Sequence, residues 1–189
     1  MTIAAVIIAG GRSTRMGREK ALAEVAGVPI IQWIIARLTP QVSMVAINTN
    51  TDSLGLLGLP LLPDITDRFG TPLAGLHAAL DWGRRTGHDR VLTVPSDSPF
   101  IPRDLAHRLG DGGPAFAVSG GQSHVLTGVW PTALADMLAE TPVRRVRDWA
   151  EQCRARPVAW SIEPYDPFFN VNTPAELAEA ERIAAEFRP

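Results

Sequence analysis

The chain has 189 residues, and its 18 Lys and Arg nearly balance its 20 Asp and Glu, for a formal net charge of −2. No apolar run reaches the ~20 residues of a membrane span, and the first residues lack the basic segment and cleavage site of a secretory signal. The single cysteine, Cys153, excludes an internal disulfide and a cysteine-based zinc site. We therefore expect a cytoplasmic protein with no membrane segment and without the broad basic face that binds nucleic acid.

The first half of the chain alternates β-branched runs with helical patterns. A strand that is apolar on both faces is predicted over 3–9, followed by a polar, glycine-containing loop over 10–20. The later elements of this half are a helix over 29–38, a strand over 42–48, a short strand near 61–62, a helix over 73–85, a strand over 90–95 and a helix over 102–109.

The second half continues the alternation. Strands over 115–119 and 124–130 flank Gly120-Gly121 and are predicted to form an antiparallel pair. Helices follow over 132–139 and 143–153, and then a strand over 158–161. The last helix is predicted to begin after Thr173, with Thr173 as its cap and Glu176 three residues beyond, and to end near 187.

This alternation predicts an α/β protein with a three-layer α/β/α architecture, a mostly parallel sheet and a single domain over 1–189. Ligands of such sheets bind at the carboxyl ends of the strands. Polar clusters over 10–20, 48–50 and 96–98 follow three of the predicted strands. We therefore expect these clusters to converge in space.

The cluster after the first strand combines glycines with cations. Gly10 and Gly11 allow backbone N–H groups to approach a ligand closely. Four cations follow within nine residues, namely Arg12, Arg15, Arg18 and Lys20. Such a loop suits a triphosphate, although its spacing is not that of a Walker A loop. The alternative is an ordinary solvated basic loop.

Carboxylates and amides mark three further places. Asp97 directly follows the strand over 90–95 and is placed to hold Mg²⁺, although it could simply form a turn. Asp64 could contact a ribose or a base, or be a solvated loop carboxylate. Asn170 and Asn172 alternate and so point to one side of an extended segment, unless they only satisfy local backbone groups. His124, which opens a strand after a Gly-Gly turn, is harder to dismiss than the other histidines.

These residues carry a resemblance to a known family. Ile8-Ala-Gly-Gly-Arg-Ser-Thr-Arg-Met-Gly-Arg-Glu-Lys20 resembles the Leu-Ala-Gly-Gly-x-Ser-x-Arg-Met-Gly-x-Asp-Lys signature of nucleotidyltransferases. Within that superfamily the chain looks like the molybdenum cofactor guanylyltransferases. The similarity continues through Pro63-Asp64, Pro72-Leu-Ala-Gly75, Ser96-Asp-Ser-Pro-Phe-Ile-Pro102 and Asn170-Val-Asn-Thr-Pro174.

The resemblance implies a Rossmann-like, nucleotide-diphospho-sugar-transferase-like fold and a Mg²⁺-dependent transfer of GMP from GTP to the terminal phosphate of molybdenum-bound molybdopterin. The nucleotide-binding half would span about residues 1–100 and the acceptor-binding half about 101–189. Molybdoenzyme-specific chaperones are a further class of partner that the family suggests. The implied nucleotide-binding residues are Ile8, Ala9, Gly10, Gly11, Lys20, Asn48, Asp64 and Asp97; Arg15, Lys20 and Asp97 are implied in catalysis, Asp97 as the metal ligand, and Asn170 and Asn172 on the acceptor side.

Three positions depart from the family pattern, namely Glu19, Thr71 and Val125. Two alternatives remain open. A cytidylyltransferase acting on molybdopterin, or another nucleotidyltransferase of this fold, would differ in the nucleotide that it prefers. A non-catalytic nucleotide-binding adaptor would differ in releasing no pyrophosphate.

Overall fold

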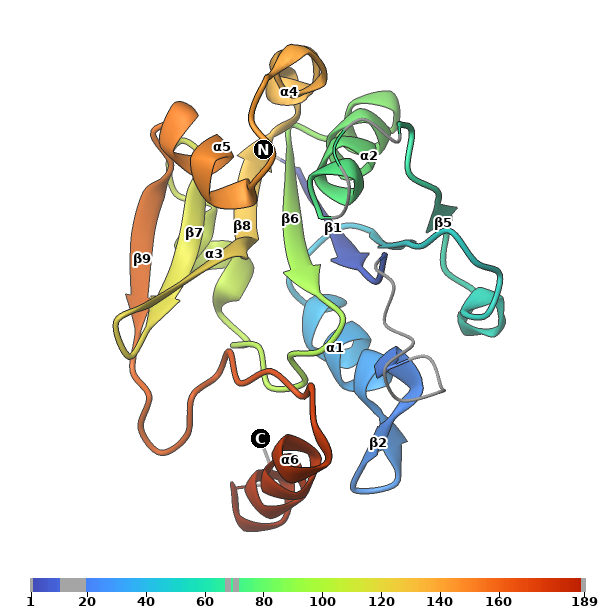
Figure 1. Ribbon diagram of the computed structural model, residues 1–189, viewed down its shortest axis with the longest axis vertical. Coiled ribbons are helices and arrows are strands. Elements are labelled where there is room, and N and C mark those ends of the chain that lie inside the picture. Colours follow the sequence, from blue (N-terminus) through green and yellow to red (C-terminus); the bar gives the residue numbers. More distant parts are fainter. Residues whose placement is uncertain (1, 11–19, 67–68, 70–71, 188–189) are drawn as a thin grey trace.

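The computed structural model describes residues 2–10, 20–66, 69 and 72–187, and its centre is one seven-stranded sheet (Figure 1). The strand order is β5-β4-β1-β6-β8-β7-β9. Every neighbouring pair is parallel except those made by β8, which runs antiparallel to both β6 and β7. The strands are β1 (Ile3–Ile8), β4 (Val45–Asn48), β5 (Leu61–Leu62), β6 (Arg90–Pro95), β7 (Ala115–Ser119), β8 (Gln122–Pro131) and β9 (Arg156–Trp160).

Helices cover both faces of the sheet, which confirms the predicted three-layer α/β architecture. The α-helices are α1 (Ile30–Leu38), α2 (Leu73–Arg85), α3 (Leu105–Leu109), α4 (Ala135–Glu140), α5 (Val146–Gln152) and α6 (Pro174–Phe187). Short 3-10 turns lie at η2 (Lys20–Leu22), η3 (Gly55–Leu57) and η4 (Thr132–Leu134). None of the helices in the described part of the chain is long and apolar enough to cross a membrane.

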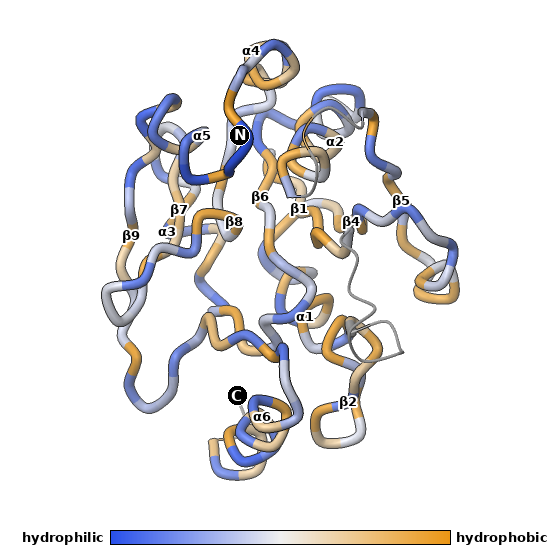
Figure 2. The backbone as a smooth tube through the Cα atoms, in the orientation of Figure 1, coloured by the Kyte–Doolittle hydropathy of each residue, from blue (hydrophilic) through white to orange (hydrophobic). Residues whose placement is uncertain are grey.

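Strand β1 shows how the two layers form. Its side chains alternate between the faces, so that Ala5 and Ile7 join one hydrophobic cluster and Val6 and Ile8 join the other. The first cluster contains residues of α1, α3 and α6, and the second contains residues of α2, α4 and α5. Figure 2 shows the hydrophobic residues of the central strands in orange. Burial on both faces explains why the strand is apolar throughout.

A small hairpin, β2 (Glu24–Val25) and β3 (Val28–Pro29), was not predicted. Its two-residue turn has positive φ at both positions, 53° at Ala26 and 72° at Gly27. An alanine rarely adopts this conformation, but the carboxylate of Glu181 on α6 accepts a hydrogen bond of 2.9 Å from the N–H of Ala26. A contact with a helix 155 residues away therefore helps to fix a turn that the local sequence does not signal.

Several predicted boundaries differ from the observed ones. The predicted helix over 143–153 begins at Val146, because Arg145 is extended with φ −122° and ψ 142°. The predicted helix over 102–109 begins at Leu105, since residues 102–104 form a turn. The antiparallel pairing of β7 with β8 confirms the prediction around Gly120-Gly121. The division into functional halves near residue 100 stays a prediction.

Candidate functional site

The carboxyl ends of β1, β4 and β6 lie side by side, so the clusters over 48–50 and 96–98 lie on either side of Gly10, the first residue of the cluster over 10–20; residues 11–19 of that cluster are outside the described residues. Ile8 is in register with Asn48 on one side and with Pro95 on the other. The N–H of Ala9 donates to the carbonyl oxygen of Asn48 at 2.9 Å, and the N–H of Ser96 donates to the carbonyl oxygen of Ile8 at 3.2 Å. The parallel ladder thus continues past the strand ends and fixes the backbone of Ile8, Ala9 and Gly10 between the other two clusters.

Asn48 and Asn50 hold the carboxylate of Asp64. Asn48 is fully buried, and its Nδ2 donates to Asp64 Oδ1 and to the carbonyl oxygen of Leu62, both at 2.9 Å. Asn50 Nδ2 donates to Asp64 Oδ2 at 2.9 Å, and its Oδ1 accepts from the N–H of Asp64 at 2.8 Å. The half-buried carboxylate therefore has a fixed orientation beside the end of β4, and each of its oxygens keeps a further lone pair for a ligand.

Two glycines make room for the Asn48 side chain. A Cβ at Gly75 would lie 2.3 Å from Asn48 Oδ1, and a Cβ at Gly10 would lie 3.1 Å from the same atom. Asn48 Oδ1 is buried, and none of the described residues donates a hydrogen bond to it. Gly75 is therefore required for steric reasons, and a Cβ at Gly10 would make a tight contact with the same oxygen of Asn48, the residue that orients Asp64.

Asp97 lies in the connection from β6 to α3, and this connection is tied to the segment before α6. The N–H of Val171 donates to the carbonyl oxygen of Asp97 at 2.9 Å. Ser98 Oγ donates to Asn170 Oδ1 at 2.6 Å. These two hydrogen bonds bring the segments of Asp97 and Asn170 together, although 73 positions separate them in the sequence. Asn170 is exposed, whereas Val171 is buried.

Asn172 begins the turn into α6. Its N–H donates to Glu176 Oε2 at 2.7 Å, and the N–H of Thr173 donates to the same oxygen at 2.8 Å. The N–H of Glu176 donates in return to Thr173 Oγ1 at 3.2 Å. The predicted capping box is therefore confirmed, and Asn170 and Asn172 are both exposed on either side of the buried Val171, as the alternation predicts.

The far end of the Asp97 connection is anchored from α1 and from the residues that follow it. Arg37 is buried and its guanidinium donates to the carbonyl oxygen of Ile101 at 3.0 Å; burial lowers the pKa of Arg37. Gln41 Nε2 donates to the carbonyl oxygen of Pro102 at 2.9 Å, and Gln41 Oε1 accepts from the N–H of Ala106 at 2.9 Å. The loop that carries Asp97 is thus held at both ends.

Some predicted residues cannot be placed. Gly11 and Arg15 lie outside the described residues, as do the departures Glu19 and Thr71. Lys20 opens η2, but its side chain is outside the described part. The predicted roles of this loop toward a triphosphate therefore stay predictions.

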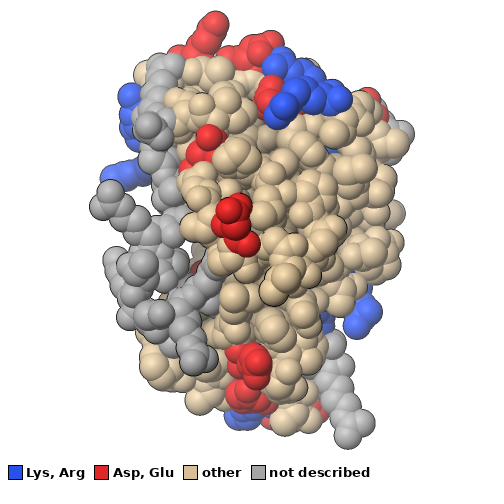
Figure 3. All heavy atoms as spheres, turned by 90° about the vertical axis from the view of Figure 1, so that its right-hand side faces the viewer, with Lys and Arg blue, Asp and Glu red and all other residues tan. Residues whose placement is uncertain are grey.

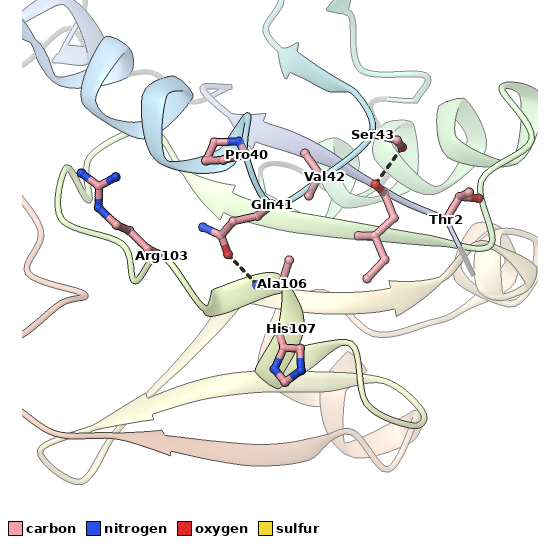
Figure 4. A pocket seen from close by; sticks show the side chains of 9 residues that line it. Thr2, Pro40, Gln41, Val42, Ser43, Arg103, Ala106 and His107 are labelled. Carbon is pink, nitrogen blue, oxygen red and sulfur yellow. Dashed lines mark hydrogen bonds between the residues drawn. The ribbon is translucent and has the colours of Figure 1, made fainter.

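A pocket of about 610 Å³ lies at the opposite edge of the sheet (Figure 4). Its lining includes Thr2 and Ile3, where β1 begins, together with Gln41, Ser43 and Ala106. Because nucleotide sites of parallel sheets are at the carboxyl ends, this pocket is not part of the candidate site. On the face of the molecule that Figure 3 shows, the described charged residues stand in small separate groups.

Two parts of the site were not singled out from the sequence. Asn50 was seen only as a member of the polar cluster 48–50, and its position two residues past Asn48 was the available signal. The second is a chain of hydrogen bonds through Ser119, His124 and Asp166 at the ends of β7 and β8. Of these three residues, only His124 carries a signal in the sequence, because it follows a Gly-Gly turn.

The sheet, covered by helices on both faces and with polar groups at its carboxyl edge, is of the α/β class to which nucleotidyltransferases belong. Residues 5–158 match the MobA-like NTP transferase domain. The chain belongs to this family, and within it to the molybdenum cofactor guanylyltransferases, as its curated relatives indicate.

Two relatives and one solved structure document the likeness. The molybdenum cofactor guanylyltransferase of Rhodobacter capsulatus is 42% identical over 96% of this chain and 96% of its own. That of Nitrobacter hamburgensis is 40% identical over 95% of this chain and 93% of its own. The crystal structure of molybdopterin-guanine dinucleotide biosynthesis protein A from Archaeoglobus fulgidus superposes with a TM-score of 0.73 at 21% identity, over 98% of this chain and 100% of that one.

Proposed function

We propose that this protein transfers GMP from GTP to the terminal phosphate of molybdenum-bound molybdopterin in the cytoplasm, giving the guanine dinucleotide form of the cofactor and pyrophosphate. The observation that carries the proposal is that two carboxylates lie at the carboxyl edge of one sheet: Asp64, oriented by Asn48 and Asn50, and Asp97, whose loop is hydrogen-bonded to Asn170. Relatives that share about two fifths of the sequence over nearly the whole chain are named for the guanylyl reaction.

The nucleotide would lie over β1 and β4. In this proposal the main chain of Ile8, Ala9 and Gly10 lines the nucleotide, and Gly11, Arg15 and Lys20 hold its phosphates. Asp64 accepts a hydrogen bond from an N–H or O–H of the guanosine. Asn48 acts on the nucleotide through Asp64, because the side-chain amide of Asn48 already donates its hydrogen bonds to Leu62 and Asp64.

Asp97 fits a magnesium ion. It is a half-buried carboxylate directly beyond β6, and Mg²⁺ prefers one or two carboxylates together with phosphate oxygens and water. Among the described residues there is no group of three or more His, Cys, Asp or Glu that could form a complete protein cage. A magnesium ion held by Asp97 would neutralise charge on the triphosphate.

The chemistry then needs positioning and charge neutralisation more than proton transfer. An oxygen of the acceptor phosphate attacks the α-phosphorus of GTP, the bond from that phosphorus to the bridging oxygen of the β-phosphate breaks, and pyrophosphate leaves with the electron pair. The nucleophile is already an anion, so a strong general base is not required. Asn170 and Asn172 would lie on the acceptor side of the reacting phosphates.

The proposal is tested by incubating the purified protein with molybdenum-bound molybdopterin, Mg²⁺ and either GTP or CTP. We expect dinucleotide and pyrophosphate to form with GTP, and to be lost when EDTA removes the metal. Preference for CTP would contradict the guanylyl assignment and favour the cytidylyl alternative. Binding of GTP without release of pyrophosphate would favour the adaptor.

A further inference from the structure

Three side chains at the carboxyl edge of the sheet form a hydrogen-bonded chain that the proposed function does not use. Ser119 Oγ donates to Asp166 Oδ1 at 2.8 Å and lies 2.8 Å from His124 Nε2. The same Asp166 oxygen accepts from the N–H of Phe168 at 2.9 Å. The chain thus joins the end of β7, the beginning of β8 and the segment before α6.

The number of protons fixes the tautomer of the imidazole. A hydroxyl has one proton, and Ser119 gives it to the carboxylate of Asp166, which can only accept. His124 Nε2 must therefore carry a proton and donate it to Ser119 Oγ. In the neutral imidazole the lone pair is then on Nδ1, to which none of the described residues donates a hydrogen bond.

The position of His124 favours contact with the acceptor. β8 runs antiparallel to β6 and β7, so the beginning of β8 lies at the same edge of the sheet as the ends of β6 and β7. In the strand order, Asp97 at the end of β6 stands between Asn48 on β4 and His124 on β8. Figure 1 shows the segment from β9 to α6 passing beneath these strand ends. His124 therefore lies on the side of Asp97 that is opposite to β1 and β4, over which the nucleotide is proposed to lie.

The segment that carries Asn170 packs directly on the imidazole. The rings of His124 and Phe168 have centroids 4.9 Å apart, and Phe168, which is 2% exposed, also packs edge-on against Trp160. Phe168 precedes Asn170 by two residues. Because Ser98 in the Asp97 loop donates to Asn170, the contact with Phe168 also fixes His124 relative to that loop.

We propose that His124 binds the acceptor of the GMP transfer, by accepting on Nδ1 a hydrogen bond from a ring N–H of the pterin, and that Ser119 and Asp166 are positioning residues for it. The inference rests on the proposed function. A neutral imidazole nitrogen offers a lone pair, and a pterin ring carries N–H donors, whereas a phosphate dianion offers only acceptors. His124 would thus recognise the ring system and not the phosphate.

The surroundings of His124 give the proposal a pH signature. Burial lowers the pKa of His124, and the carboxylate of Asp166 opposes this shift. Among the described residues, Asp166 is the charged group that acts on the imidazole. The imidazole also contacts Ser119 from β7 and Phe168 from the segment before α6, and both of these are uncharged. Protonation of Nδ1 removes its lone pair, so affinity for the acceptor should fall as the pH drops through this pKa.

The first test compares His124→Ala with His107→Ala, since His107 is an exposed histidine on α3 at the opposite edge of the sheet. Initial rates of pyrophosphate release give KM for each substrate. We expect His124→Ala to raise KM for molybdopterin by about tenfold. Its KM for GTP should stay within about twofold of wild type, and its kcat should change little. His107→Ala should match wild type. An unchanged KM for molybdopterin, or an equal rise in both KM values, would overturn the proposal.

Two milder variants separate positioning from folding. Ser119→Ala keeps the imidazole but removes the hydrogen-bond partner of His124 Nε2. We expect it to raise KM for molybdopterin by less than His124→Ala does, and to leave the melting temperature as in wild type. Asp166→Asn removes the charge that raises the pKa of His124, so the acid limb of kcat/KM for molybdopterin should move to lower pH. An acid limb of Asp166→Asn in the same place as that of wild type would contradict the assignment, since ionisation of the acceptor phosphate does not depend on Asp166.

Direct titration of molybdopterin against wild type and His124→Ala, without nucleotide, separates this inference from the function on which it rests. Weaker binding by the variant supports the role of His124 even if the wild-type chain transfers no GMP. Equal binding, together with normal GMP transfer, overturns the inference and leaves the proposed function in place.

Discussion

The side-chain oxygen of Asn48 occupies the space that a Cβ at Gly75 would need, because the two atoms would be 2.3 Å apart. Gly75 is the third residue of α2, and Asn48 ends β4. The same asparagine donates to Asp64 at 2.9 Å. Gly75 in α2 therefore influences the orientation of the Asp64 carboxylate, because it leaves room for the buried Asn48 side chain that donates to Asp64.

Replacing Gly75 with alanine should damage both stability and nucleotide binding. Alanine in a helix is favoured over glycine by about 1 kcal/mol, but displacing Asn48 would leave the buried carbonyl of Leu62 without its side-chain donor and strain the packing, at about 2–3 kcal/mol. We expect a net loss of about 1–2 kcal/mol in the free energy of unfolding, measured by urea titration, and weaker GTP binding by calorimetry.

The matched control for this change is Gly55→Ala. A Cβ at Gly55 would have no atom within 4 Å, so the same chemical change should leave stability and GTP affinity close to those of wild type. Equal behaviour of the two variants would show that the contact of Gly75 with Asn48 is unimportant.

Replacing Asp97 with asparagine keeps the size of the side chain and removes its charge. If Asp97 holds the metal, the rate of GMP transfer at saturating GTP should fall by roughly 10²–10³, because charge on the departing pyrophosphate is no longer neutralised. Asp111→Asn in the exposed turn before β7 is the control, and its rate should be unaffected. A variant at Asp97 with the full magnesium-dependent rate would exclude the proposed metal role.

The sequence predicted the frame of the site better than its internal contacts. The ranges 73–85, 90–95 and 115–119 were predicted with the observed bounds, since long periodic or uniformly buried segments carry strong local signals. The neighbouring carboxyl ends of β1, β4 and β6 followed from the rule that parallel strands end at one edge.

Contacts between distant residues had no such signal. The steric dependence of Asn48 on Gly75 and the hydrogen bond from Ser119 to Asp166 join residues 27 and 47 positions apart. Each depends on how a helix or a connection packs against the sheet, which residue types alone do not specify. The hairpin turn at Ala26 was missed for the same reason, because its partner Glu181 lies on the last helix.

Removing the hydroxyl of Ser98 should affect the acceptor more than the nucleotide. Ser98 is buried, and its Oγ donates to Asn170 at 2.6 Å. Ser98→Ala leaves Asn170 free to rotate, so we expect KM for molybdopterin to rise about three- to tenfold while KM for GTP stays near its wild-type value. Ser161→Ala, in an exposed turn, is the comparison. A larger effect on GTP than on molybdopterin would place Asn170 on the nucleotide side instead.

The capping box before α6 should contribute measurably to stability. Glu176 accepts hydrogen bonds from the N–H groups of Asn172 and Thr173, and Thr173 accepts from the N–H of Glu176. We expect Thr173→Ala and Glu176→Ala each to lower the free energy of unfolding by about 1 kcal/mol, and the double variant to lose less than the sum, since the bonds are reciprocal. Glu151→Ala on the exposed side of α5 should have little effect. Strict additivity would mean that the two residues cap independently.

Cys153 should be unreactive in the folded protein. Burial raises the pKa of its thiol to about 12, whereas an unfolded cysteine has a pKa of about 8.5. At pH 8 the folded chain then holds roughly a thousandfold less thiolate, which is the form that reacts with alkylating reagents. We expect iodoacetamide to modify native Cys153 at least about a hundredfold more slowly than the urea-unfolded chain, as followed by mass spectrometry. Comparable rates in the two states would show that the thiol is accessible and ionises normally, and Cys153 would then have to be reconsidered as a reactive group.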